Sequence, residues 1–199
     1  MKSMTVRLTG KSPLLMHNGR LADPLDEYAK ALSKVSSIRS KTEADHEEMA
    51  RLEWEGSLYL DREGRIGIPG INMRSMIVGP GGAARQHKQG KDAAKALRFD
   101  EFYPLSVNGN GSVTDYKALW NDSQYRHRVN VSIGRSTVIR TRPIFEGWAV
   151  DVTFYYHPDF ADEDDVIHWW RVAGNEVGLG DWRPQKYGPY GTFDVEVVE

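Results

Sequence analysis

The stretch from Gly174 to Gly191 combines residue types that suit contact with a polyanion. It holds five glycines and two prolines, together with arginine, lysine and aromatic side chains. Glycine lets the backbone adopt φ > 0 and lets another chain approach closely. Cationic side chains supply charge for phosphates, and aromatic rings supply faces for bases. The stretch predicts either a nucleic-acid surface or a long turn whose aromatics cover the core. The predicted contacts are Trp182, Arg183, Lys186 and Tyr187.

A second basic stretch runs from residue 126 to residue 142 and contains five arginines without a carboxylate. Like charges this close repel one another unless something anionic lies among them. We therefore expect this stretch to hold phosphates. The predicted phosphate contacts here are Arg126, Arg128, Arg135, Arg140 and Arg142, and those elsewhere in the chain are His17, Asn18, Arg74, Arg85 and Lys88.

Composition sets the broad class of the protein. The chain has 199 residues, of which 40% are apolar and 27% charged, which is ordinary for a globular domain with a core. It has no cysteine, so disulfides, thiolate zinc sites and cysteine nucleophiles are excluded. The six histidines are scattered without metal-ligand spacing, so we expect no metal and no cofactor.

The expected location follows from apolar runs and from cysteine usage. No apolar run approaches the length of a bilayer span, and the first residues are typical of a strand and not of a signal peptide. We expect a cytoplasmic protein without a membrane partner. The formal net charge of −2 argues against a basic protein overall, although charge is segregated along the chain.

Hydrophobic periodicity predicts strands interrupted by helices. Strands are expected at residues 4–8, 58–60, 66–68, 102–107, 126–133, 137–142, 148–156 and 192–198. Helices are expected from Pro24 with Asp23 as cap, from Thr42 with Asp45 completing a capping box, over 71–78, and after Asp162 as cap. Residues 83–98 are expected to form a mobile loop or a helix that forms on contact. This order predicts an α+β, ferredoxin-like (RRM-like) βαββαβ core.

The predicted domain organisation is a single domain over residues 1–199 with two elaborations. The first is a helical insertion at about 22–56; its residues 22–55 carry nine acidic and five basic side chains. The second is a basic loop and hairpin region at about 80–143, in which residues 84–98 carry five cations against Asp92 alone. These opposed charges predict a head-to-tail homo-oligomer, which forms an open filament if the rotation does not close.

Three segments of the chain, residues 68–77 (IPGINMRSMI), residues 178–193 and the opening strand with residues 13–19 (PLLMHNG), resemble the RAMP superfamily, the proteins that form CRISPR effector backbones. Residues 68–77, IPGINMRSMI, are similar to its "IPGSSLKGALR" segment. Residues 178–193 are similar to its C-terminal glycine-rich loop, and the opening strand with residues 13–19, PLLMHNG, to its first strand and turn. The segments cover about a fifth of the chain and fall at the expected start, middle and end.

The resemblance implies a ferredoxin-like RNA-binding fold that polymerises head to tail along a strand. It also implies a protruding β-hairpin thumb, for which residues 126–142 are the candidate. The chain departs from the family at Ser75, where most members have glycine, and it is short for a CRISPR backbone subunit. It therefore suits a stand-alone relative that works on single-stranded DNA or RNA, for example in phage replication.

The resemblance also raises an enzymatic alternative. Some relatives are metal-independent ribonucleases with a histidine base, which points to His17, and others cleave RNA with a loop aspartate, which points to Asp23 or Asp26. Both aspartates lie at an expected helix N-terminus, where capping already explains them. We therefore expect no catalytic residue and a single-stranded nucleic-acid-binding protein. A ribonuclease, and a structural subunit joined through charged strips, are the alternatives.

Overall fold

The computed structural model describes residues 1–113, 115–134 and 136–198. Arg135, one of the predicted phosphate contacts, lies outside the described residues. The chain forms two compact units, and each is assembled from separate segments. Unit 1 comprises residues 1–14, 60–114 and 145–199, and unit 2 comprises residues 15–59 and 115–144. The predicted α+β class is confirmed, because helices and antiparallel sheets both contribute.

Unit 1 is built on an antiparallel sheet with the strand order β10-β1-β9-β4. These strands are β1 (Lys2–Gly10), β4 (Leu97–Phe99), β9 (Trp148–Tyr156) and β10 (Phe193–Val197). The short strand β6 (Ser106–Val107) pairs with the start of β9, whereas β4 pairs with its end. Between them, β5 (Phe102–Pro104) leaves the sheet and pairs with β3 (Gly67–Pro69). The strand predicted over 102–107 is therefore two short strands in different sheets.

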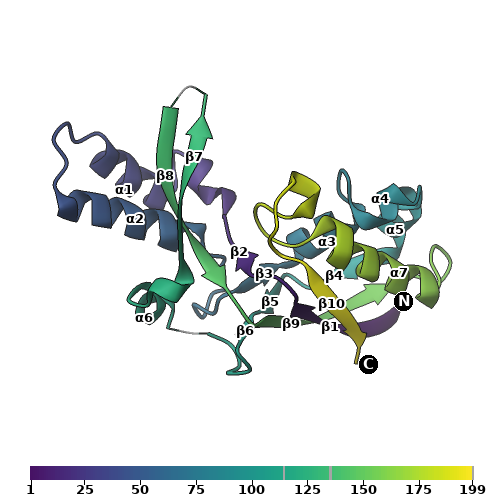
Figure 1. The fold of residues 1–199 in the computed structure, drawn as a ribbon. Coiled ribbons are helices and arrows are strands. Elements are labelled where there is room, and N and C mark those ends of the chain that lie inside the picture. Colours follow the sequence, from purple (N-terminus) through teal and green to yellow (C-terminus); the bar gives the residue numbers. More distant parts are fainter. Residues whose placement is uncertain (114, 135, 199) are drawn as a thin grey trace. The chain divides into compact units, whose positions relative to one another are not determined.

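One face of this sheet is buried beneath helices (Figure 1). The helices of unit 1 are α3 (Gly70–Val78), α4 (Ala83–Gln86), α5 (Gly90–Ala96) and α7 (Glu163–Val172). Alternate residues of β1 and β9 lie opposite one another in register and are buried: Met4 with Phe154, Val6 with Val152, and Leu8 with Val150. The helix α7 adds Trp169 and Trp170, which are buried, so aromatic packing dominates this core.

The opposite face of the sheet is polar. At its centre Arg7 donates two hydrogen bonds of 2.7 Å to the carboxylate of Asp151, and the hydroxyls of Thr5 and Thr153 lie 3.0 Å apart. Tyr155 on the same face is 42% exposed. The strand pleat therefore separates an apolar face from a face whose central charges pair with each other.

Unit 2 combines helices with a hairpin (Figure 1). Its helices are α1 (Glu27–Ser36), α2 (Glu43–Ser57), α6 (Tyr116–Trp120) and the short 3₁₀ turns η1 (Gly19–Ala22) and η2 (Ser123–Tyr125). The strands β7 (Arg126–Ile133) and β8 (Ser136–Phe145) form the hairpin, and β2 (Leu14–Leu15) pairs with the other edge of β8. The predicted strands 126–133 in unit 2 and 148–156 in unit 1 are confirmed with the same bounds.

Capping decided where the helices begin. The capping box of Thr42 and Asp45 is confirmed at α2, and Asp162 caps α7 as predicted. The predicted start of the first helix at Pro24 is wrong. Asp23 instead accepts from the backbone N–H of Leu25 in a turn, and Asp26 caps α1 by accepting from the N–H of Tyr28. A second aspartate with the same capping ability moved the start by three residues.

Two further expectations need correction. The predicted strands 58–60 and 66–68 reduce to a single bridge between Leu60 and Ile66 and to β3, because Asp61 closes the turn by accepting from the backbone N–H groups of Glu63 and Arg65. The basic stretch 83–98 is already folded, mainly into α4, α5 and β4, because four of its five alanines, Ala83, Ala84, Ala93 and Ala96, are buried. None of the helices in the described part of the chain is both long and apolar enough to traverse a bilayer.

Candidate nucleic-acid interface

The hairpin of unit 2 distributes its arginines over two faces. Residues directly opposite in an antiparallel pair share a face, and successive residues alternate between faces. Arg142 lies opposite His127 and Arg140 opposite Val129, so these two arginines share one face. Arg126 and Arg128 lie on the other face. The hairpin therefore does not gather the predicted arginines into a single phosphate-binding row.

Arg140 has a carboxylate partner that the local sequence does not contain. Its guanidinium donates to the Glu53 carboxylate, and the other oxygen of Glu53 accepts from the backbone N–H of Thr141 at 3.0 Å. Glu53 comes from α2 and its side chain is only 8% exposed. The carboxylate thus satisfies an edge N–H of β8 and balances the charge of Arg140, which weakens the case for Arg140 as a phosphate contact.

Arg126 is held by an aromatic ring. Its guanidinium lies 5.0 Å from the centroid of the Trp120 ring, and Trp120 in turn meets Trp54 edge to face at 5.8 Å. The indole N–H of Trp54 donates to the backbone carbonyl of Tyr125 at 2.7 Å. The base of the hairpin is therefore fixed to α2 and α6 by aromatic packing, and Arg126 contributes to it.

Arg128 is the hairpin arginine whose charge is most available. It is exposed, and within the ranges that the structure describes no ion pair engages it. Arg142 is half-buried and lines a cleft together with His17. Of the four arginines described in the hairpin, Arg128 is thus the best placed to meet a phosphate in solvent, and Arg142 to meet a ligand in the cleft.

This cleft of unit 2 carries convergent polar groups and has a volume of about 460 Å³. Its apolar walls are Leu21, Ala22, Leu32 and Val131, and its polar lining is His17, Glu53, Ser57, Arg140, Thr141 and Arg142. Apolar walls with a few fixed polar groups are typical of small-ligand sites. The cleft joins residues from both segments of unit 2.

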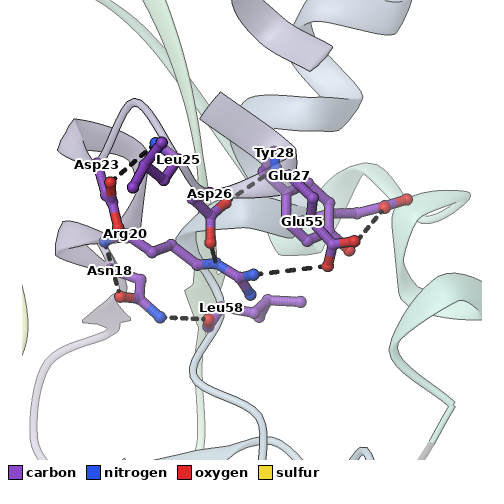
Figure 2. Close-up of polar contacts among 9 residues, drawn as sticks. All are labelled: Asn18, Arg20, Asp23, Leu25, Asp26, Glu27, Tyr28, Glu55 and Leu58. Atoms are coloured by element: carbon purple, nitrogen blue, oxygen red, sulfur yellow. Dashed lines mark hydrogen bonds and ion pairs between the residues drawn. The ribbon is translucent and has the colours of Figure 1, made fainter. Parts of the chain in front are cut away.

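The turn after β2 is held by a network of hydrogen bonds and ion pairs (Figure 2). Asn18 accepts from the N–H of Arg20 at 3.1 Å, and its side-chain amide donates to the Leu58 carbonyl at 3.0 Å. Arg20 pairs with Asp26 at 2.8 Å and lies 3.6 Å from Glu27. Asn18 therefore ties the turn to the end of α2, and this role competes with its predicted contact to nucleic acid.

Asp26 belongs to the same network of hydrogen bonds and ion pairs. These contacts bear on the ribonuclease alternative. Burial raises the pKa of Asp26, but hydrogen bonds from Arg20 and from the N–H of Tyr28 outweigh it, so the net pKa lies below the ordinary value. A carboxylate with a lowered pKa is a poor general base. Asp23 is exposed in the preceding turn, and His17 is exposed at the cleft.

The acidic stretch of unit 2 is largely balanced within the unit. Arg51 pairs with Glu48 at 2.7 Å and with Glu55 at 2.6 Å. Asp45 is the N3 residue of the capping box and accepts from the backbone N–H of Thr42 at 2.8 Å, and Glu53 pairs with Arg140. Glu43 and Glu47 are exposed near the start of α2. The surplus of negative charge that the sequence predicts for an oligomer interface is therefore concentrated at that end of α2.

In unit 1 the glycine-rich loop follows α7 and a wide helical turn, η3 (Ala173–Val177). Gly180 and Gly191 have φ of 81° and 73°, in the left-handed region. A Cβ on Gly188 would overlap the carbonyl oxygen of Trp182, and one on Gly191 would overlap that of Leu179. This geometry agrees with the glycine density of the loop, because Gly180 and Gly191 have a positive φ and the chain approaches closely at Gly188 and Gly191.

Two aromatic residues of this loop also occupy the left-handed region. Trp182 has φ of 45° and is 44% exposed, and Tyr187 has φ of 59° and is 99% exposed. Lys186, which precedes Tyr187 and ends the 3₁₀ turn η4 (Pro184–Lys186), is exposed as well. Bulky residues rarely adopt this conformation, and the strain is tolerated mainly at functional sites.

Arg183 has a structural role in the same loop. It donates to the Gly180 carbonyl at 2.8 Å and twice to the side-chain oxygen of Gln185, at 3.0 and 2.7 Å. Gln185 in turn donates to the Pro80 carbonyl at 2.6 Å. The Arg183 guanidinium thus stabilises the loop through hydrogen bonds within it, whereas the side chains of Trp182, Lys186 and Tyr187 are exposed to solvent.

The remaining predicted contacts of unit 1 are less concentrated. Arg85 donates to the Val78 carbonyl at 2.8 Å, and Arg74 to that of Ala94 at 3.5 Å. Lys88 is exposed, with φ of 63°. Arg74 and Arg85 therefore support the packing of α3 to α5, and Lys88 offers the more accessible charge.

Sequence reasoning missed three residues that shape these regions. Glu53 was assigned to the acidic insertion, although it balances Arg140. Trp120 holds Arg126, and Gln185 joins the glycine-rich loop to Pro80. A carboxylate at a buried position of α2 was a signal for Glu53, because buried charges need partners. For the other two the sequence carries no comparable signal.

The comparisons with known proteins leave the family open. No family model matches this chain, and no curated protein matches it. Among the described residues no group of three or more histidine, aspartate or glutamate side chains is arranged to hold a metal ion.

Proposed function

We propose that the protein binds single-stranded nucleic acid, RNA or DNA, and that copies assemble head to tail along the strand without cleaving it. The observation that carries this proposal is the outer surface of the glycine-rich loop. Trp182 and Tyr187 are exposed there on a left-handed backbone, with Lys186 between them in sequence. Stacking of bases on exposed aromatic rings beside a cation is the usual mode of binding without sequence preference.

The topology of unit 1 supports a ferredoxin-like core within this proposal. Counting only the strands of the main sheet, β1, β4, β9 and β10 come first to fourth in the chain, and their spatial order is fourth, first, third, second. The helix α3 lies between the first pair in the chain and α7 between the last pair. This order supports a βαββαβ arrangement, and together with the three sequence segments it supports a relative of the RAMP superfamily.

The hairpin of unit 2 adds an electrostatic contribution. Arg128 is its accessible cation, and Arg142 lines the cleft. The polar outer face of the sheet contributes less, because Arg7 is already paired with Asp151 at its centre. We propose the hairpin and the glycine-rich loop, each within its own unit, as the two contact regions.

Head-to-tail assembly is supported by exposed charges of opposite sign. Glu43 and Glu47 are exposed on α2, whereas Lys88 and Lys91 are exposed in unit 1. Opposed patches on one chain fit a heterologous contact between copies. Electron microscopy with and without a long single strand tests this part; extended helical assemblies are expected, and strictly monomeric particles on the strand would contradict it.

The test of the binding function uses labelled single-stranded DNA, single-stranded RNA and duplex at two salt concentrations. Single strands are expected to bind more tightly than duplex, and log affinity is expected to fall with log salt by about 0.7 per phosphate contact. Failure of every nucleic acid to bind would overturn the proposal in favour of a structural subunit.

The bound RNA is then run on a gel, which tests the enzymatic alternative. Intact RNA is expected. Cleaved RNA would favour a ribonuclease, and the matched variants His17→Ala, Asp23→Ala and Asp26→Asn would then identify the base. Loss of cleavage in Asp26→Asn alone would identify Asp26 as the base, because asparagine caps a helix as well as aspartate does.

A further inference from the structure

The cleft of unit 2 has the chemistry of a nucleobase site. We propose that it binds a single nucleotide and prefers bases with an exocyclic amino group, that is cytosine, adenine or guanine over uracil and thymine. The base would lie between the apolar walls, with the amino group directed to Glu53. The inference deepens the proposed function, on which it rests for the natural source of the nucleotide.

Glu53 is the group that confers the preference. It lines the cleft although its side chain is only 8% exposed. The carboxylate has about four acceptor positions. The Arg140 guanidinium and the N–H of Thr141 occupy two of them. The positions that remain accept hydrogen bonds only. An exocyclic amino group brings two N–H donors to them, whereas uracil and thymine bring only the N3–H, which lies between two carbonyl oxygens that repel a carboxylate.

The contacts of Glu53 also fix its orientation. One partner is a side chain of β8 and the other is the backbone of the same strand. A carboxylate held at two points loses little freedom when a ligand binds, which increases the discrimination available from one hydrogen bond. A carboxylate that accepts from the amino group of cytosine is an established mode of base recognition.

The rest of the lining suits a flat, apolar body that carries negative charge. Leu21 and Leu32 come from η1 and α1, and Val131 comes from the hairpin. Arg140 and Arg142 both line the cleft, and Glu53 supplies a carboxylate. The two guanidinium groups of the lining favour a nucleotide phosphate over an uncharged ligand. A volume of about 460 Å³ is within the range of small-ligand sites.

The experiment compares cytidine and uridine monophosphate. Their bases differ at C4, which carries an amino group in cytosine and a carbonyl in uracil, and at N3, which is an acceptor in cytosine and an N–H donor in uracil. Binding is followed by calorimetry and by NMR shifts of α1 and β7 in the full chain. Cytidine monophosphate is expected to bind about tenfold more tightly, the effect of one hydrogen bond to a charged group. Equal affinities would overturn the inference, as would shifts confined to residues of unit 1.

Two variants test whether the cleft is the site that binds the nucleotide and selects its base. Glu53→Gln is expected to abolish the preference, with Glu47→Gln on the exposed side of α2 as the matched control. Because Glu53→Gln also disturbs the pair with Arg140, Leu32→Trp provides a second test by filling the cleft. Its control is Leu25→Trp, since Leu25 is 76% exposed outside the cleft. Unchanged nucleotide binding in folded Leu32→Trp would overturn the inference.

The same comparison with oligocytidine and oligouridine strands separates this inference from the proposed function. A preference for the cytidine strand that Leu32→Trp removes supports both. Equal, tight binding of the two strands would overturn the cleft as a base site and leave strand binding intact. Binding of cytidine monophosphate without binding of either strand would support the cleft, overturn the strand function, and identify free nucleotides as the source.

Discussion

The basic hairpin and the glycine-rich loop differ in how well their residue types predicted their structural roles. In the hairpin the cations looked equivalent, yet Arg140 pairs with Glu53 from α2 and Arg126 lies against Trp120. In the loop, by contrast, the glycines have the positive φ or close approach that their density predicts. Of the loop cations Arg183 and Lys186, Arg183 is hydrogen-bonded within the loop and Lys186 is exposed.

The difference has a physical cause. A glycine acts through the backbone at its own position, so its role is encoded locally. An arginine acts through a long side chain that reaches whichever anion, ring or carbonyl the fold brings near. Charge density along the sequence is therefore a weaker guide to a ligand surface than glycine density is to loop geometry. The predictions below test this distinction, from the largest expected effect to the smallest.

Substitution at Gly191 tests the loop directly. Gly191→Ala is expected to lower the free energy of unfolding by about 3 kcal/mol, because left-handed strain adds to overlap with the Leu179 carbonyl. Gly64→Ala is the control, since Gly64 has φ of 77° with no atom within 4 Å of an added Cβ. Its cost is expected to be about 1 kcal/mol by urea unfolding. Equal costs would show that close approach contributes nothing at Gly191.

Removal of the hidden carboxylate tests the hairpin. Glu53→Ala is expected to lower the free energy of unfolding by about 2 kcal/mol, because the Thr141 N–H and the Arg140 guanidinium lose their acceptor. Glu48→Ala on the same helix breaks an exposed pair with Arg51 and is expected to cost about 0.5 kcal/mol. Thermal and urea unfolding measure both. A cost for Glu53→Ala as small as that for Glu48→Ala would restore Arg140 as an available cation.

Truncation of an exposed aromatic side chain tests whether nucleic acid binds at the glycine-rich loop or at the outer face of the sheet. Trp182→Ala is expected to weaken single-strand binding by about tenfold, the effect of one lost base stack, with little change in melting temperature. Tyr155→Ala is the matched control, because Tyr155 has a similar exposure of 42% on the outer face of the sheet. Loss of affinity in the Tyr155 variant and not in the Trp182 variant would move the site to the sheet.

The smallest effect is expected from single arginines of the hairpin. Arg128→Ala is expected to make the dependence of log affinity on log salt shallower by about 0.7, the contribution of one phosphate contact. Arg140→Ala should leave the slope unchanged, because its charge is balanced by Glu53. Affinity titrations at several salt concentrations compare the two variants. Equal reductions in slope would mean that the pair with Glu53 opens when the strand binds.

Much of the fold followed from the sequence because its signals are local. Alternating apolar residues defined β7 and β9 to the residue, and the capping box placed the start of α2 at Thr42. The start of α1 was missed, since Asp23 and Asp26 are equally good caps and only their neighbours choose between them. Where two local signals compete, tertiary contacts decide; here the pair of Arg20 with Asp26 is one of them.

The division into two units and the partners of the charged residues were decided by tertiary structure alone. Residues 15–59 and 115–144 are distant in sequence, and no local pattern indicates that they form one unit. The cleft exists because of this assembly: α1 and α2 supply Leu32 and Glu53, and the hairpin supplies Val131 and Arg140. The sequence by itself determined the loop glycines and the strand patterns, because backbone conformation and alternation are properties of neighbouring residues. Pairing across many residues depends on the path of the whole chain, which the order of residue types does not express.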